Sequence, residues 1–399
     1  MSVKVVIIGA GHGGVQAAAS LREEGFEGEM VLISEENDLP YQKPPLSKGY
    51  LQGKQSEEAI LFRSPHFFQN HQIDLRLGVN IAQLDTEGQF VITKEGETID
   101  YTHLILATGA TNRKLTMEGA ADVLYLRTLA DAKAIAHRLD TARKIAIIGG
   151  GFIGLELAAL AQEKCKEVSV IEAQSRLMER VLPAVISDVF QKTHEECGVQ
   201  VHLNALTKSI ENHCIITKEG KKIEADLILA GIGVIPETSL AEEAGIACEN
   251  GILVNEFQQT SVANIYAFGD CANHNNALAQ KRLGWESVQK AVDQANTAVN
   301  RVLGKTQPYH AVPWFWTNQY HLKLQMAGIS AGFDRYVLRG DVDADKFSVY
   351  YFQENRLIAV DSLNRPADHL NARKLLAAQI SPTDAQIGDL NVNLNQLVG

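Results

Sequence analysis

Two segments of this 399-residue chain repeat the same glycine pattern. Residues 5–14 read VVIIGAGHGG and residues 145–154 read IAIIGGGFIG, so each places an apolar run directly before glycines with GxGxxG spacing. In this pattern the first glycine permits a tight turn, the second lets the backbone approach a pyrophosphate, and the third lets a helix pack closely on a strand. A chain that builds this turn twice is expected to hold two dinucleotides.

Each glycine turn lies inside a predicted strand, helix, strand repeat. The predicted elements are residues 3–8, 13–24 and 30–34 in the first repeat and residues 144–148, 152–164 and 167–171 in the second. The N-terminus of each helix would direct backbone N–H groups at the phosphates. The glycines expected to line the two phosphate sites are Gly9, Gly11, Gly13 and Gly14, and Gly149, Gly151 and Gly154.

An acidic residue follows the second strand of each repeat, Glu35 in the first and Glu172 in the second. A carboxylate at this place accepts hydrogen bonds from ribose hydroxyls and repels a 2′-phosphate. Glu172 therefore predicts a preference for NADH over NADPH, which Arg176 and Arg180 could soften. The alternative is that Glu172 is a solvated loop carboxylate.

The rest of the chain predicts an α/β protein of two Rossmann-like dinucleotide-binding domains and a C-terminal α+β domain. The expected segments are residues 1–112 and 242–311 for the first domain, 113–241 for the second and 312–399 for the third. In the third, Phe347, Val349 and Tyr351 are expected on one strand face and residues 367–379 in a helix, and residues 381–399 are expected to be a loosely packed tail.

Composition narrows the class of protein. A formal net charge of −11 without a basic tract argues against nucleic-acid binding. The chain enters a strand at once, and no apolar stretch approaches the roughly 18 to 20 residues of a membrane span, so a cytoplasmic protein is expected. The five cysteines form no close pair and the histidines no ligand spacing, which predicts reduced thiols and no metal site.

Seven short motifs follow one another along the chain, and an eighth lies near its end at residues 360–366. The seven are residues 9–14 (GAGHGG), 44–48 (PPLSK), 107–109 (ATG), 126–128 (LRT), 149–156 (GGGFIGLE), 269–270 (GD) and 312–316 (VPWFW). The chain resembles the FAD-dependent NADH:ferredoxin reductases of bacterial oxygenase systems, the putidaredoxin reductase and biphenyl dioxygenase reductase type, over essentially its whole length. These reductases belong to the pyridine nucleotide-disulfide oxidoreductase superfamily but lack its redox disulfide.

The resemblance implies a set of cofactor contacts. Glu35 would meet the FAD ribose, Asp270 the ribityl chain, and the backbone of Val79 the adenine. The other residues implied at FAD are Lys43, Pro44, Lys48, Ala107, Thr108, Gly109, Arg127, Gly269, Glu286, Ser287 and Val288. The residues expected at NADH, beside the glycines of the second turn, are Phe152, Ile153, Glu156, Glu172 and Gly233. Trp316 is expected as a cofactor contact at the flavin edge. Each of three FAD contacts has an alternative explanation. Arg127 and Lys48 could be solvated surface residues, and Asp270 could simply form a turn or cap a helix.

Lys48 and Glu156 are the residues expected to act in the reaction. Glu156 lies on an otherwise apolar helix, and a buried carboxylate needs a partner. In the family, a lysine at the position of Lys48 pairs with this glutamate. Lys48 would stabilise charge on the reduced flavin, and Glu156 would orient Lys48 and the nicotinamide carboxamide.

The resemblance implies that NADH reduces FAD and that FAD passes single electrons to a small acidic [2Fe–2S] ferredoxin, which serves an oxygenase. Positive charge for docking the acidic ferredoxin could come from Lys281, Arg282, Lys290 and Lys323. The alternative is that these residues are scattered over the surface and form no docking site. Trp314 and Trp316 could line the flavin edge, or be domain-interface core. Gly284-Trp285 departs from the family pattern. A monomer or weak homodimer is expected.

Three other functions remain open. An NADH oxidase or peroxidase would want a cysteine redox centre near residues 41–48, and none is present in that segment. A rubredoxin reductase would differ only in its one-electron acceptor. A protein like apoptosis-inducing factor, which binds NADH and acts in assembly, would turn NADH over slowly. The length, the absence of a leader and the acidic charge argue against this last reading.

Overall fold

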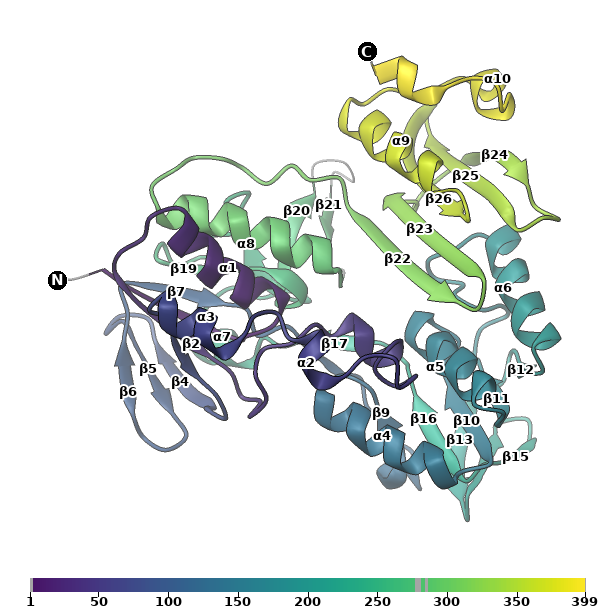
Figure 1. Ribbon diagram of the computed structural model, residues 1–399, viewed down its shortest axis with the longest axis horizontal. Coiled ribbons are helices and arrows are strands. Elements are labelled where there is room, and N and C mark those ends of the chain that lie inside the picture. The colour runs from purple at the N-terminus through teal and green to yellow at the C-terminus, as the bar shows by residue number, and fades with distance from the viewer. Residues whose placement is uncertain (1–2, 277–280, 284–285, 399) are drawn as a thin grey trace. The chain divides into compact units, whose positions relative to one another are not determined.

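The computed structural model describes residues 3–276, 281–283 and 286–398, and it divides the chain into two compact units (Figure 1). The first unit comprises Met1–Gln42, Glu57–Thr111 and Ile235–Phe315. The second comprises Lys43–Ser56, Asn112–Val234 and Trp316–Gly399. The sequence predicted three domains made of four segments, whereas this division gives two units, so the predicted domain boundaries stay a prediction.

A parallel sheet forms the centre of the first unit. Its strand order is β19-β7-β1-β2-β3. The late strand β19 pairs with β7, so the chain returns to its first sheet after leaving it, in line with the expectation that a segment after residue 241 belongs to the first domain. The strands are β1 (Lys4–Ile8), β2 (Glu29–Ile33), β3 (Asp74–Arg76), β7 (His103–Leu106) and β19 (Ile265–Ala267).

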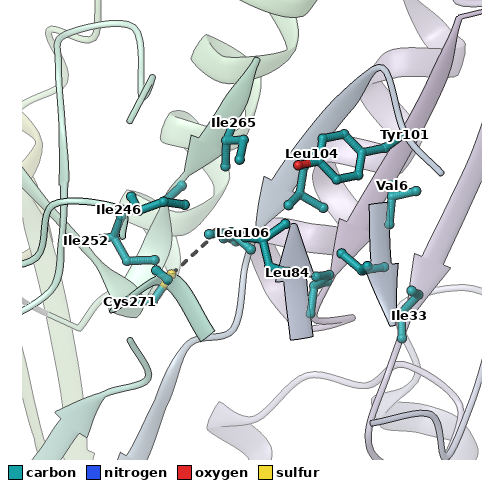
Figure 2. Close-up of a cluster of buried hydrophobic side chains, with 14 of the residues drawn as sticks. Val6, Ile33, Leu84, Tyr101, Leu104, Leu106, Ile246, Ile252, Ile265 and Cys271 are labelled. Carbon is teal, nitrogen blue, oxygen red and sulfur yellow. Dashed lines mark hydrogen bonds between the residues drawn. The ribbon is translucent and has the colours of Figure 1, made fainter. Parts of the chain in front are cut away.

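Both faces of this sheet are covered, which explains why its strands are almost continuously apolar. On β1, Val5 and Ile7 pack into one core, beneath helices α1 (His12–Glu23) and α8 (Val288–Val302). Val6 and Ile8 point to the opposite face and into a second core, shown in Figure 2. That second core is closed by the antiparallel strands β4 (Ile81–Asp85), β5 (Phe90–Thr93) and β6 (Thr98–Asp100).

The second unit repeats this plan. Its parallel sheet has the order β12-β11-β10-β16-β9, and its antiparallel layer is β13-β14-β15. The strands are β9 (Leu124–Tyr125), β10 (Lys144–Ile148), β11 (Glu167–Ile171), β12 (Gln200–His202), β13 (Thr207–Glu211), β14 (Cys214–Thr217), β15 (Lys222–Glu224) and β16 (Leu227–Ala230). The helices are α4 (Leu129–Thr141), α5 (Phe152–Glu163) and α6 (Ala184–Glu196).

The C-terminal segment of the second unit is built on a sheet with the order β22-β23-β26-β25-β24. Phe347, Val349 and Tyr351 share one face of β25, but Ser348 and Tyr350 on the other face are buried too. The helix expected over residues 367–379 is present as α9, but the sequence did not show that this helix packs on β23 and β26, so it identified only one buried face. The elements are β22 (Trp314–Gln319), β23 (Leu322–Gly328), β24 (Arg335–Asp341), β25 (Lys346–Gln353), β26 (Arg356–Leu363) and α9 (Pro366–Ala377).

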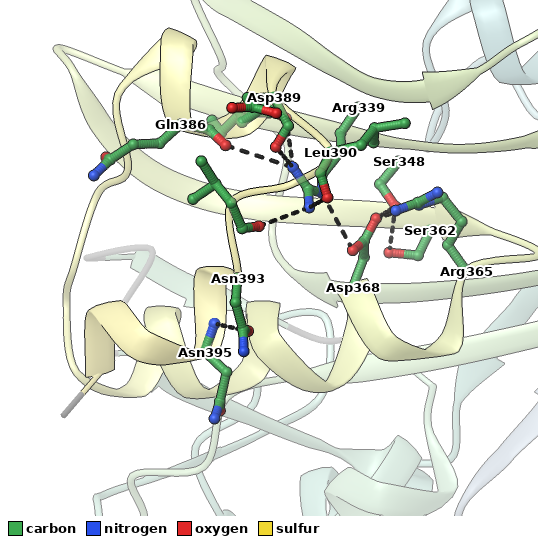
Figure 3. A network of polar contacts seen from close by, with 12 residues as sticks. Arg339, Ser348, Ser362, Arg365, Asp368, Gln386, Asp389, Leu390, Asn393 and Asn395 are labelled. Carbon is green, nitrogen blue, oxygen red and sulfur yellow. Dashed lines mark hydrogen bonds and ion pairs between the residues drawn. The ribbon is translucent and has the colours of Figure 1, made fainter.

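The prediction of a loosely packed tail after residue 380 is wrong. Arg339 on β24 is 5% exposed, and its guanidinium donates to the carbonyls of Ile387 at 2.8 Å, Asp389 at 2.7 Å and Val392 at 3.0 Å (Figure 3). Its Nε lies 3.4 Å from a carboxylate oxygen of Asp368. One buried arginine thus supplies hydrogen bonds to several backbone carbonyls of the tail. Because these bonds anchor the tail, it needs few apolar residues and can be polar in composition.

Short elements complete the described part of the chain. They are η1 (Pro44–Ser47), α2 (Glu57–Ile60), α3 (Pro65–Asn70), β8 (Ala110–Asn112), η2 (Ala120–Asp122), β17 (Val234–Pro236), α7 (Ser239–Glu243), β18 (Ile252–Val254), η3 (Gly269–Cys271), β20 (Ala272–Asn276), β21 (Lys281–Leu283), α10 (Asp384–Gly388) and η4 (Leu394–Val398). Among the residues described, no helix combines the length and apolarity needed to cross a lipid bilayer.

Candidate functional site

The first glycine turn, residues 9–14, has one open position between two closed ones. Gly9 has a φ of +105°, and a Cβ there would lie 2.2 Å from the carbonyl oxygen of Ala107. A Cβ at Gly14 would lie 1.8 Å from the carbonyl oxygen of Gly9. A Cβ at Gly11 would meet nothing within 4 Å. The fold itself requires the outer glycines, whereas the middle one borders open space; we call this turn the first cradle.

The second glycine turn, residues 149–154, has the same geometry, and we call it the second cradle. Gly149 has a φ of +106°, and its Cβ would lie 2.5 Å from the carbonyl oxygen of Gly231. A Cβ at Gly154 would lie 2.1 Å from the carbonyl oxygen of Gly149, whereas a Cβ at Gly151 would have no neighbour closer than 3.9 Å. Both cradles therefore leave room for a pyrophosphate in front of a helix N-terminus whose first N–H groups lack intrahelical partners.

Gly13 has a packing role within the fold. A Cβ at Gly13 would lie 2.7 Å from the ring of Phe268 and 3.3 Å from the carbonyl oxygen of Ala291. This glycine lets helix α1 approach Phe268 and helix α8 closely. Packing therefore explains it without a ligand, and contact with FAD stays a prediction.

The loop after β2 presents two acids with different surroundings. Glu35 is exposed, as a residue that meets a ribose would be before the ligand binds. The carboxylate of the next residue, Glu36, accepts a hydrogen bond from the hydroxyl of Tyr41. Val79 donates its backbone N–H to the carbonyl of Ser34 at 2.9 Å, so an adenine could meet this residue through its carbonyl. Glu35 and Val79 thus fit the predicted nucleotide end of the first cradle.

The turn at residues 107–109 lies against the first cradle. The N–H of Ala107 donates to the carbonyl of Ile8 at 2.8 Å, and the Thr108 hydroxyl donates to the carbonyl of Glu237 at 2.7 Å. Gly109 has a φ of +75° and accepts a hydrogen bond from the N–H of Glu237 at 2.9 Å. These contacts fix the turn as part of the wall of the first cradle.

Helix α8 begins beside the predicted ribityl contact. Ser287 caps the helix, is 5% exposed, and donates its hydroxyl to the carbonyl of Trp314 at 3.1 Å. Val288 is the first helical residue and is half-buried, and Glu286 is exposed. Gly269 has a φ of +74° and donates its N–H to Gln294 of α8 at 3.0 Å, which holds Asp270 near this helix.

Lys290 cannot belong to a docking patch, so that prediction is wrong. Its side chain is fully buried, and its ammonium donates to the carbonyl of Ala272 at 2.9 Å. Burial lowers the pKa of Lys290, and the negative charge of Asp270 opposes that shift. Arg282 and Lys323 are exposed. The side chain of Lys281, and Gly284 and Trp285 altogether, lie outside the described residues.

The acid of the second cradle holds the glycine loop itself. One carboxylate oxygen of Glu172 accepts the N–H of Gly150 at 2.6 Å, and the other accepts the N–H of Gln174 at 2.8 Å. Arg176 donates to the Leu182 carbonyl at 2.5 Å and to the hydroxyl of Ser187 at 3.1 Å. Arg176 is therefore engaged in fixing the start of α6, while Arg180 is exposed.

The predicted pairing of Lys48 with Glu156 is confirmed. The Lys48 ammonium lies 2.7 Å from Oε2 of Glu156, whose side chain is 3% exposed. The same oxygen accepts the hydroxyl of Ser47 at 2.5 Å, and Oε1 accepts the hydroxyl of Thr317 at 2.7 Å. A buried carboxylate is thus satisfied by one cation and two hydroxyls. Sequence reasoning missed Ser47 and Thr317, although Ser47 lies inside the PPLSK motif.

The remaining predicted residues of the second unit are placed as follows. Lys43 donates to the carbonyl of Arg127 at 3.4 Å, and Pro44 begins the short helix η1 that ends at Ser47. Gly233 has a φ of +102°. Phe152 and Ile153 form the first turn of α5, where Ile153 is 42% exposed. Three sets of contacts stay predictions. FAD would be contacted by Lys43, Pro44, Lys48 and Arg127, NADH by Phe152, Ile153 and Gly233, and the flavin edge by the half-buried Trp316.

All five cysteines are free thiols. Cys271 follows Asp270, and its thiol donates to the carbonyl of Phe268 at 3.2 Å. Burial raises the pKa of Cys271, and it raises the pKa of Cys248 to about 11, so both thiols stay protonated near neutral pH. Within the described residues, no group of three or more His, Cys, Asp or Glu side chains could hold a metal ion.

Comparison with known proteins identifies the family. Residues 3–295 match the family described as pyridine nucleotide-disulphide oxidoreductase, and residues 314–398 match the family described as reductase C-terminal. Rhodocoxin reductase of Rhodococcus erythropolis is 41% identical over 98% of this chain and 93% of its own length.

Two solved structures are similar over nearly the whole chain. The ferredoxin reductase for the CYP199A2 system from Rhodopseudomonas palustris superposes with a TM-score of 0.97 at 39% identity, covering 99% of this chain and 100% of that one. The covalent putidaredoxin reductase–putidaredoxin complex superposes with a TM-score of 0.96 at 35% identity, covering 99% of this chain and 98% of that one. These matches confirm the resemblance and the fold class inferred from the motifs. The chain belongs to the pyridine nucleotide-disulphide oxidoreductase family and is an oxidoreductase that uses FAD and NAD(P)H.

Proposed function

We propose that this protein takes electrons from NADH onto FAD and delivers them one at a time to a [2Fe–2S] ferredoxin that serves an oxygenase. FAD supplies the chemistry that links a two-electron donor to a one-electron acceptor. The observation that carries the proposal is the presence of two open cradles in one chain whose PPLSK segment has no cysteine pair. Without a thiol relay inside the chain, electrons must leave to an external carrier.

The residues of this chain supply binding, orientation and charge. The first cradle, with Glu35, Val79 and Asp270, would hold FAD, and the second cradle, with Glu172, would hold NADH. Lys48 would place a positive charge where the flavin gains electrons, and Glu156 would fix the position of Lys48. Neither residue is proposed to transfer a proton.

The partner proposal rests on the relatives, whose names specify ferredoxins. Arg282 in the first unit and Lys323 in the second are the exposed cations left from the predicted docking charge, and each would attract an acidic carrier. We propose that the protein acts as a monomer or weak homodimer, because its partner needs only brief access to the flavin.

The acceptor can be tested by coupling NADH oxidation to cytochrome c reduction. The assay is run with the purified protein alone, with a [2Fe–2S] ferredoxin encoded nearby, and with a rubredoxin. We expect the ferredoxin to raise cytochrome c reduction at least tenfold above the protein alone. A rate raised only by rubredoxin would replace the proposed partner, and rapid NADH oxidation by oxygen without any carrier would favour an oxidase.

Replacement of Glu172 should change the nucleotide preference. Glu172→Arg removes the charge that repels a 2′-phosphate and adds one that attracts it, so the ratio of kcat/KM for NADH to that for NADPH should fall by roughly 10². Because Glu172 also holds the N–H of Gly150, Glu172→Gln is the control: it keeps an acceptor and should lower the ratio less. An unchanged ratio in Glu172→Arg would remove Glu172 from the ribose site.

Replacement of Lys48 should slow flavin reduction more than it weakens FAD retention. Lys48→Ala removes a cation that would act where negative charge develops, and we expect the stopped-flow rate of reduction by NADH to fall on the order of 10². Lys144→Ala is the matched control, because Lys144 forms an exposed ion pair with Glu224 at the same 2.7 Å distance in the same unit. A wild-type reduction rate in Lys48→Ala would contradict the assigned role.

A further inference from the structure

The ion pair of Lys48 and Glu156 is connected to a chain of buried polar side chains from the C-terminal sheet. On β22, Thr317 and Gln319 are 0% and 2% exposed, and the residue between them, Asn318, is exposed. Residues two apart share a strand face, so both polar side chains point into the protein from the same face. A buried polar pair on one face of a strand has to be satisfied by specific partners.

Those partners form a continuous relay. On α6, the ring nitrogen Nε2 of His194 lies 2.8 Å from Oε1 of Gln319. The amide nitrogen of Gln319 donates to the hydroxyl of Thr317 at 3.2 Å, and that hydroxyl donates to Oε1 of Glu156 at 2.7 Å. The relay thus joins α6, β22 and α5 within the second unit.

The carboxylate fixes the direction of every bond in the relay. An ionised carboxylate only accepts, so Thr317 must donate to Glu156 and can only accept from Gln319. Gln319 then uses its amide nitrogen toward Thr317 and presents its oxygen to His194, which must carry its proton on Nε2. Burial lowers the pKa of His194, so the ring is neutral and this single tautomer persists.

We propose that Thr317, Gln319 and His194 are positioning residues that orient Glu156, and through it Lys48, for the reaction between NADH and FAD. This inference rests on the proposed function of the Lys48 and Glu156 pair. The C-terminal domain, through β22, therefore completes the reaction site of the second unit. Hydrogen bonds aligned head to tail in a chain polarise and strengthen one another, so the loss of one link is felt along the relay.

The kinetic test uses Thr317→Val, which keeps the β-branched shape and removes the hydroxyl. We expect the limiting rate of flavin reduction to fall about tenfold, from the loss of one hydrogen bond to a charged group, with the Kd for NADH changed less than about twofold. Thr317→Ser should restore the rate. Thr217→Val is the matched control: Thr217 is a buried strand residue of the same unit, 1% exposed, that accepts the N–H of Lys221 and does not touch the relay.

A double-mutant cycle separates positioning from a general loss of stability. In a Glu156→Gln background, Thr317→Val should slow flavin reduction by less than about twofold further, because the charged carboxylate that Thr317 orients toward Lys48 has already been replaced. Additive effects would overturn the relay. Wild-type flavin reduction in Thr317→Val, while Lys48→Ala and Glu156→Gln are slow, would also overturn it and leave the proposed function intact. Wild-type rates in all three variants would refute the role of the Lys48 and Glu156 pair itself.

A spectroscopic test needs no turnover and applies even if Thr317→Val is poorly stable. Long-range 1H–15N spectra of the FAD-free and FAD-loaded protein should show His194 protonated on Nε2 throughout the neutral pH range. Glu156→Gln should shift the Nε2–H signal, and the shift should vanish when Thr317→Ala interrupts the relay. A His194 signal that ignores Glu156→Gln, or that is protonated on Nδ1, would contradict the relay.

Discussion

Gly151→Val will produce a folded, FAD-containing protein that binds NADH at least about 100-fold more weakly than the natural chain. The backbone at Gly151 has φ −85° and ψ −177°, which any L-residue adopts, and an added Cβ would have no neighbour closer than 3.9 Å. The fold therefore tolerates valine. The side chain would instead occupy the space into which the NADH pyrophosphate must come.

Gly11→Val is the reciprocal variant and serves as the matched control. Gly11 has φ −79° and ψ −163°, and a Cβ there meets nothing within 4 Å. We expect this protein to be purified without flavin yet to keep its NADH affinity. Isothermal titration with NADH, the flavin absorbance and circular dichroism measure the three properties. NADH binding that survives in Gly151→Val, or bound FAD in Gly11→Val, would mean that the cradles do not hold the nucleotides as proposed.

Arg339→Met will destabilise the C-terminal domain by on the order of 3 to 5 kcal/mol, because it removes a buried cation from Asp368 and leaves tail carbonyls without a donor. Urea unfolding should show an early transition, and trypsin should release residues after 380. The carbonyls of Ile387, Asp389 and Val392 are the ones that lose a bond.

Arg335→Met provides the control for this prediction. Arg335 lies on the same strand and pairs with Asp384 of the tail at 2.8 Å, but the side chains are 36% and 64% exposed. An exposed pair contributes about 0 to 1 kcal/mol, so this variant should resemble the natural protein. Equal stability of the two variants would show that the buried guanidinium does not anchor the tail.

The sequence predicted the two sheets because their signals are local. An apolar run, a glycine turn and an alanine-rich helix occur within 30 residues of each other, so β1, α1 and β2 could be located to within a residue or two. The pairing of Lys48 with Glu156 was also accessible, since a carboxylate on an apolar helix needs a partner and the family resemblance indicated Lys48.

The features that were mispredicted or missed depend on contacts distant in sequence. In the sequence Lys290 looks like a surface lysine, because nothing nearby shows that its ammonium donates a hydrogen bond to the carbonyl of Ala272. Arg339 reads as a surface strand residue because its partners lie some 50 residues later. Thr317 and Gln319 carry no local signal, because Asn318 between them is polar too and residues 317–319 read TNQ. Their partners, Glu156 and His194, lie on other elements.

The central claim is that electrons pass directly from NADH to FAD with no sulfur centre between them, and an anaerobic titration tests it most directly. The purified protein should be yellow with about one FAD per chain, and one molecule of NADH per FAD should bleach the flavin absorbance completely. A colourless protein that takes up no flavin, or a titration that needs two molecules of NADH per FAD, would contradict the account.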